Sequence, residues 1–165
     1  MKKLLFIVSA LILSACNTTS PTPSPSPSPS PTGVTVSATD LALIQTGSTL
    51  ATGAVLNFAV SQPSSRTQLA NQIYASASAL YQISGGNPLT PAALTNLLNS
   101  YSVNGAAQYT QYVTAIDALY STYYAEYVTG GSSNVQNFAA IVNALAEGAE
   151  TAASAYSTIP PTSTP

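Results

Sequence analysis

Residues 106–128 read AAQYTQYVTAIDALYSTYYAEYV, a stretch whose large side chains recur at spacings of three and four. At 100° per residue these side chains fall within about 140° of a helical wheel. We call them the tyrosine stripe: Tyr109, Tyr112, Val113, Ile116, Leu119, Tyr120, Tyr123, Tyr124 and Tyr127. Thr, Gln, Ser and Ala occupy the opposite side. The stretch therefore predicts an amphipathic helix with one side facing a core.

The tyrosine stripe has two interpretations. In the first, which is the more usual role of such a stripe, the rings share a core with Val113 and Ile116 and the hydroxyls reach its rim. In the second, part of the stripe contacts a glycan or another protein, because tyrosine suits half-hydrated interfaces. Tyr112 and Tyr124 lie at the two edges of the stripe and would then be the exposed contact residues.

Four other segments show helical periodicity, and residues that start or end helices separate them. Ser37-Ala38-Thr39-Asp40 resembles a capping box with Asp in place of Glu, and Thr90-Pro91 places an N-cap hydroxyl before a helical proline. Gly85-Gly86 and Gly130-Gly131 are typical helix ends. Helices are therefore expected over about 38–60, from the turn at 63–65 to about Ser84, after Thr90-Pro91 to about Tyr101, over 106–128, and from Ser132 or Ser133 through Tyr156.

These segments predict an all-α fold. Helices joined by short loops prefer antiparallel neighbours, so we expect an up-and-down bundle of four long helices and one short helix over residues 34–158. Many core positions are Ala or Gly, which should let the helices pack closely. Gly47 and Gly53 weaken the first helix by up to ~1 kcal/mol each relative to Ala, and they could admit a neighbouring helix.

Charged side chains are rare, at 5% of the chain. From Cys16 onward Arg66 is the one basic residue against five acidic residues, which gives a net charge of −4. Nucleic-acid binding needs clustered Lys and Arg to neutralise phosphates, so we exclude a nucleic-acid partner. The chain has no histidine, so Ser-His-Asp and Cys-His catalytic arrangements and histidine metal sites are excluded as well. We expect no cofactor.

Residues 1–16 combine a basic start with an apolar run over 4–13. That run is shorter than the roughly 20 residues that a membrane-spanning helix needs. Leu13-Ser14-Ala15 follow, and then comes Cys16, the single cysteine, which has no disulfide partner within the chain. A basic start, a short apolar middle and small residues at the end are typical of a removable export signal.

Leu13-Ser14-Ala15-Cys16 resembles the lipobox of bacterial lipoproteins, in which a dedicated peptidase cuts before an acylated cysteine. The resemblance implies that residues 1–15 are removed after recognition of Leu13, Ser14 and Ala15. It also implies that Cys16 carries a diacylglycerol on its sulfur, often with a further chain such as palmitate on its amino group. Several acyl chains anchor a protein firmly where one binds only marginally. Asn17 replaces the Asp that retains Gram-negative members in the inner membrane, which favours the outer membrane.

Residues 16–33 form a Pro/Ser/Thr-rich tether, in which prolines alternate with Ser or Thr from Pro21 to Pro31. Proline and the residue before it both favour polyproline II, which extends about 3.1 Å per residue and gives a reach of roughly 50 Å. No two prolines here are three apart, which disfavours a Pro-x-x-Pro docking peptide. We interpret the tether as a stalk, and residues 159–165 as a disordered tail.

Carboxylates are the remaining candidates for acid–base chemistry. Glu147 and Glu150 lie three apart on a predicted polar face, where we expect two solvated acids. Asp117 and Glu126 flank opposite edges of the tyrosine stripe and cannot pair on their own helix. A glycosidase needs a buried or paired acid, so we expect no catalytic site.

The sequence therefore favours a non-catalytic lipoprotein of the cell envelope, whose bundle binds or scaffolds another envelope protein or a cell-wall glycan. One alternative is a cell-wall enzyme that uses a lone carboxylate such as Glu126. A second is a phage-encoded lipoprotein that blocks receptors or DNA injection at the envelope, although no residue selects it. The helical part carries no motif of a known family, and the sequence predicts no oligomeric state.

Overall fold

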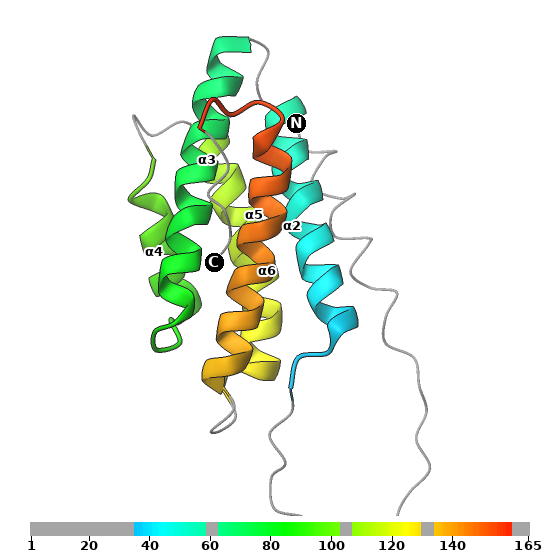
Figure 1. Cartoon of the computed structure of the whole chain (residues 1–165). Coiled ribbons are helices and arrows are strands. Elements are labelled where there is room, and N and C mark those ends of the chain that lie inside the picture. Colours follow the sequence, from blue (N-terminus) through cyan, green and yellow to red (C-terminus); the bar gives the residue numbers. More distant parts are fainter. Residues whose placement is uncertain (1–34, 59–62, 103–106, 130–133, 160–165) are drawn as a thin grey trace, which may run out of the picture. The chain divides into compact units, whose positions relative to one another are not determined.

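The computed structural model of the chain describes residues 35–58, 63–102, 107–129 and 134–159. These residues form α2 (Ala38–Phe58), α3 (Pro63–Ser84), α4 (Pro91–Asn99), α5 (Ala107–Tyr127) and α6 (Asn134–Ser154). They contain no strand, so the predicted all-α bundle of four long helices and one short helix is confirmed (Figure 1). The chain divides into the units Met1–Thr32 and Gly33–Pro165. The signal, the tether and most of the tail lie outside the described residues.

The predicted caps of α2 and α4 are confirmed. The Asp40 amide donates to Ser37 Oγ at 3.1 Å, and the Ser37 hydroxyl donates to Asp40 Oδ2 at 2.7 Å. Asp is one methylene shorter than the usual Glu, and here its carboxylate receives the capping hydroxyl. At α4 the Ala93 amide donates to Thr90 Oγ1 at 3.3 Å, and Pro91 occupies the first turn. Side-chain caps thus start both helices where the sequence predicts.

Helix ends agree with the prediction to within a few residues. The turn expected at 63–65 is instead the first turn of α3, because a proline needs no hydrogen-bond acceptor there. After Ser84 the Gly86 amide donates to the Ile83 carbonyl at 2.9 Å and closes the helix. The helix end predicted at Gly130-Gly131 lies outside the described residues.

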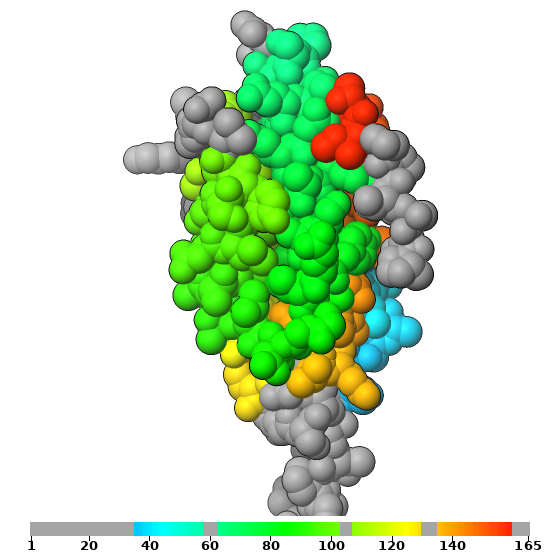
Figure 2. All heavy atoms as spheres, turned by 60° about the vertical axis from the view of Figure 1, so that its left-hand side comes forward, coloured from blue at the N-terminus to red at the C-terminus, as the bar shows by residue number. Residues whose placement is uncertain are grey.

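Helix α6 lies between α2 and α3 (Figure 1). It makes its most extensive contacts with α2, to which it runs parallel, and with α3, to which it runs antiparallel. The consecutive helices α2 and α3 run antiparallel, as expected, but they contact each other little because α6 lies between them. The short α4 packs against α5 and lies beside α3 on the face shown in Figure 2.

Gly148 sets the distance between α6 and α2. A Cβ at this position would lie 2.3 Å from the Gln45 carbonyl oxygen and 2.7 Å from Ser48 Cβ. In the same contact the buried Ser48 hydroxyl donates to the Leu145 carbonyl at 2.7 Å. The close packing expected from small residues is therefore present, and Gly148 is the glycine that makes it possible.

The two glycines singled out in α2 behave differently from each other. A Cβ at Gly47 would lie 3.2 Å from a methyl of Leu119, so α5 does approach α2 there. A Cβ at Gly53 would meet nothing within 4 Å. The expectation of close helix approach is thus confirmed at Gly47 and wrong at Gly53, which faces away from the neighbouring helices.

The apolar side chains of α6 are mostly buried. Phe138, Val142, Leu145 and Ala149 are buried, whereas Val135 is 42% exposed because it lies in the first turn. Ile141 and Ala146 are also buried, because α6 packs against more than one neighbouring helix.

Substituting Gly148 and Gly53 by Ala should change stability in opposite directions. Gly148→Ala places a methyl against the backbone of α2, and we expect the free energy of unfolding to fall by about 1–3 kcal/mol, as for other overpacked cores. Gly53→Ala, the matched control, adds a methyl in open space and should raise it by up to ~1 kcal/mol through helix propensity. Urea denaturation followed by circular dichroism measures both. A Gly148→Ala protein as stable as the wild type would contradict the close α2–α6 contact.

Candidate functional site

The tyrosine stripe is mostly core. Tyr109, Tyr112 and Tyr120 are fully buried, as are their apolar neighbours Val113 and Ile116. Leu119, Tyr123, Tyr124 and Tyr127 are partly buried and pack against the same core. The first of the two interpretations, in which the rings form a core and hydroxyls reach its rim, therefore describes most of the stripe.

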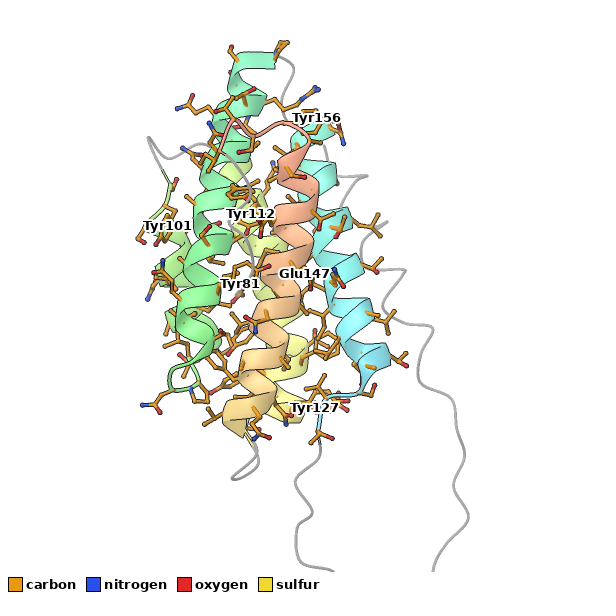
Figure 3. The ribbon with its side chains drawn as sticks, in the orientation of Figure 1. Tyr81, Tyr101, Tyr112, Tyr127, Glu147 and Tyr156 are labelled. Carbon is orange, nitrogen blue, oxygen red and sulfur yellow. The ribbon has the colours of Figure 1, made fainter. Side chains whose placement is uncertain are left out.

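The prediction that Tyr112 is an exposed contact residue is wrong. Its exposed fraction is 0%, and its hydroxyl lies 3.3 Å from the hydroxyl of the buried Ser76 on α3. Figure 3 shows Tyr112 in the interior, between α3 and α6. A helical wheel places Tyr112 at the edge of the stripe, but α3 covers that edge. Burial raises the pKa of Tyr112 and raises that of its neighbour Tyr109 to about 12.

Tyr124 at the other edge of the stripe is half-buried. Its ring centroid lies 5.5 Å from that of Tyr120, at an interplanar angle of 49°. Part of the ring therefore supports the core and part reaches the surface. A contact role for Tyr124 stays a prediction.

Asp40 ties the start of α2 to the end of α5. The Tyr127 hydroxyl donates to Asp40 Oδ2 at 3.0 Å, the same oxygen that receives the Ser37 hydroxyl. The hydrogen bond from Ser37, followed by that from Tyr127, lowers the pKa of Asp40. Burial and the Asp40 carboxylate raise the pKa of Tyr127. The neighbouring Tyr123 ring stacks on Tyr127 at 6.3 Å. The acid thus acts as a structural acceptor between two helices.

The two glutamates of α6 have different surroundings. Glu147 is exposed, as predicted, whereas Glu150 is half-buried and accepts a hydrogen bond from the hydroxyl of the buried Tyr74. Burial raises the pKa of Tyr81, and the charges of Glu150 and Glu147 raise it further. The prediction of two solvated acids is therefore wrong for Glu150, because tyrosines of α3 reach across to α6. Figure 3 labels Tyr81 on α3 and Glu147 on α6.

The remaining acids form no catalytic pair. Thr95 of α4 donates to Asp117 Oδ1 at 2.6 Å, a bond that holds the short helix to α5. Glu126 is exposed near the end of α5. All five acidic residues lie in the described part of the chain, and none of them is fully buried. In that part, no three potential metal ligands among His, Cys, Asp and Glu come together.

A groove of about 580 Å³ lies between α3 and the end of α4. We call it the α3–α4 groove. Its polar lining consists of Ser64, Thr67, Gln68, Gln72, Ser100 and Tyr101. Asn71 and Ala75 complete the wall on α3, and none of these side chains is charged. Figure 2 shows the face on which α3 and α4 form this part of the surface.

The polar groups of this groove fall into two sets. Asn71 is engaged, because its carboxamide oxygen accepts from the Ser157 hydroxyl at 2.8 Å and from the Thr158 amide at 3.0 Å. Among the described residues, hydrogen bonds do not engage the carboxamides of Gln68 and Gln72 or the hydroxyl of Tyr101. The groove therefore presents uncharged donors and acceptors beside an aromatic ring.

A second hollow of about 380 Å³ lies between the first halves of α2 and α6. Ala38, Leu41, Ala42, Ala140 and Ala144 supply most of its wall, and Gln45, Asn143 and Glu147 supply its polar groups. It has no aromatic side chain, so it offers fewer ways to recognise a ligand than the α3–α4 groove.

The sequence analysis placed its candidate contact surface on α5 and did not predict the α3–α4 groove. It gave Tyr101 only as the approximate end of the short helix and attached no role to Gln68 or Gln72. The two glutamines are four apart and therefore share one face of α3, which was a detectable pattern. That the end of α4 completes this face depends on tertiary structure.

The predicted lipidation residue Cys16 and the predicted signal residues Leu13, Ser14 and Ala15 lie outside the described residues. Among the described helices, none combines the length and apolar character that crossing a bilayer requires. No protein-family model, curated protein or solved structure matches the chain.

Titration of the Tyr109 hydroxyl should lower the free energy of unfolding in alkaline solution. Its pKa is about 12 in the folded chain, and the ordinary value is 10.0, so between these values the unfolded chain loses a proton that the folded chain keeps. The stabilisation that comes from the protonated Tyr109 hydroxyl is complete below pH ~10. It is lost as pH rises toward 12, at up to ~1.4 kcal/mol per pH unit.

Tyr109→Phe tests this dependence. At neutral pH the variant should be about 1 kcal/mol less stable, because the Leu98 carbonyl loses its hydrogen bond from the Tyr109 hydroxyl. The deficit should shrink above pH ~10, since Phe has no proton to lose. Urea denaturation at several pH values measures it, and a deficit that stays constant would contradict the buried, protonated state of Tyr109.

Proposed function

We propose that this chain is an exported bacterial lipoprotein whose helical domain is a non-catalytic binding or scaffolding module. The observation that carries the proposal is Leu13-Ser14-Ala15-Cys16 directly after the apolar run at 4–13. Acylated Cys16 would hold the protein at a membrane, and the alternating prolines of 16–33 would hold the domain away from that surface. Asn17 favours the outer membrane in a Gram-negative host.

The inventory of side chains supports a non-catalytic role. Histidine is absent from the chain, the lysines are Lys2 and Lys3, and the single cysteine is the proposed lipid site. Asp40, Asp117 and Glu150 accept hydrogen bonds from hydroxyls on neighbouring segments. These carboxylates support packing, and no observation favours the cell-wall enzyme that would use Glu126.

The surface chemistry supports a binding role toward an uncharged partner. Charged residues are 5% of the chain, so long-range electrostatic steering of an ionic ligand would be weak. The α3–α4 groove offers hydroxyls, carboxamides and one aromatic ring without a charge. Another envelope protein or a cell-wall glycan fits this chemistry better than nucleic acid does.

Metabolic labelling tests the lipid anchor. The full chain is expressed in a Gram-negative host with labelled palmitate, and we expect label in the wild type and none in Cys16→Ser. Asn17→Asp is the matched control: it should keep the label and move the protein from the outer to the inner membrane fraction. A wild-type chain without label, or equal label in Cys16→Ser, would overturn the proposal.

A further inference from the structure

We propose that the α3–α4 groove binds a neutral oligosaccharide, with the Tyr101 ring against an apolar sugar face and Gln68 and Gln72 hydrogen-bonded to its hydroxyls. The inference deepens the binding role proposed above and rests on it for the location of the groove in the cell envelope. The groove volume of about 580 Å³ lies within the range of small-molecule sites. A protein interface needs a larger contact area than such a groove provides.

Tyr101 differs from most other tyrosines of the chain in the state of its hydroxyl. Hydrogen bonds between described residues engage the hydroxyls of Tyr74, Tyr109, Tyr112, Tyr120, Tyr127 and Tyr156. In the same part of the chain the Tyr101 hydroxyl makes none, and the residue is half-buried at the edge of the groove. Its ring packs partly against the core, which holds the ring in place at the edge of the groove.

The two glutamines supply hydrogen-bonding groups at a defined spacing. Gln68 is exposed and Gln72 half-buried, and one helical turn separates them by about 6 Å along α3. Each carboxamide has two donor hydrogens and an acceptor oxygen, which match the mixed donor and acceptor character of sugar hydroxyls. Between them Asn71 holds residues 157–158, and its amide also donates to Thr158 Oγ1 at 3.1 Å. The wall of the groove is therefore braced, which lowers the entropy cost of binding.

The charge distribution selects a neutral sugar over an anionic one. The groove lining has no basic side chain, and the guanidinium of Arg66 lies over the Tyr156 ring at 5.2 Å. A carboxylate or phosphate in the groove would lose hydration without gaining an ion pair.

Saturation-transfer NMR on the full, acylated chain in detergent tests the inference. The probes are the neutral trisaccharides chitotriose, cellotriose and maltotriose, with trigalacturonate as the anionic comparison. We expect at least one neutral probe to bind with a dissociation constant of about 0.1–1 mM, as a few hydrogen bonds and one stacked ring allow. We expect no binding of trigalacturonate.

Variants locate the binding site. Tyr101→Ala should weaken binding about tenfold or more, and Tyr101→Phe should weaken it less because the ring remains. Gln68→Ala removes an exposed side chain, so it should leave the melting temperature unchanged and weaken binding about threefold or more. Gln111→Ala on the exposed side of α5 is the matched control, and it should change neither the melting temperature nor the binding of the trisaccharide.

Three results would overturn the inference: binding of none of the neutral probes, binding of trigalacturonate alone, or neutral binding that both Tyr101→Ala and Gln68→Ala leave unchanged. Failure here is distinguishable from failure of the lipoprotein proposal. Palmitate labelling reports on Cys16 alone, and the sugar titration reports on the groove alone.

Discussion

The close contact of α2 and α6 at Gly148 is the constraint on which the rest of the bundle depends. Any side chain at this position would collide with the Gln45 carbonyl, so glycine is what lets two parallel helices approach along much of their length. Inside this contact the Ser48 hydroxyl donates a hydrogen bond to the Leu145 carbonyl. Helices α3 and α5 pack against other sides of α6, and its remaining face, which includes Asn143 and Glu147, is exposed. The α2–α6 pair is parallel, although successive helices of the chain alternate in direction (Figure 1).

Hydroxyl groups take the place that ion pairs occupy in many bundles. With charged residues at 5% of the chain, the helices are joined by tyrosine, threonine and serine donors bonded to carboxylates and carbonyls. Thr95 joins α4 to Asp117 of α5, and the Tyr120 hydroxyl reaches the Leu89 carbonyl before α4. Each such bond contributes about 1 kcal/mol net. Tyrosine suits this role because its ring buries a large apolar area while its hydroxyl spans to a neighbouring segment.

The same use of tyrosine bears on the binding site proposed above. Tyrosine hydroxyls that join helices are buried or already hydrogen-bonded, so they are poorly placed to bind a ligand. Most tyrosines of the stripe are therefore poor candidates for a binding site. Gln68, Gln72 and Tyr101, by contrast, line the α3–α4 groove together, and none of them is charged. A lipid anchor at Cys16 would make a low-charge surface workable, because an anchored protein depends less on charge repulsion to stay dispersed. The low charge of the chain and the uncharged lining of the groove both favour the uncharged partner proposed above.

The sequence by itself determined the all-α class, the five helices to within a few residues, and the caps at Ser37 and Thr90, because these depend on local periodicity and on hydrogen bonds between near neighbours. It also supplied the lipobox resemblance, which is a linear motif. Tertiary structure alone decided that α6 lies between α2 and α3, that Gly148 rather than Gly53 is the point of closest approach, and that Tyr112 is buried against Ser76. Helical periodicity shows which residues share a face, but the neighbour that covers the face is set by packing between distant segments. The groove is of this second kind, since Gln68 and Tyr101 are brought together only when the end of α4 comes to lie beside α3.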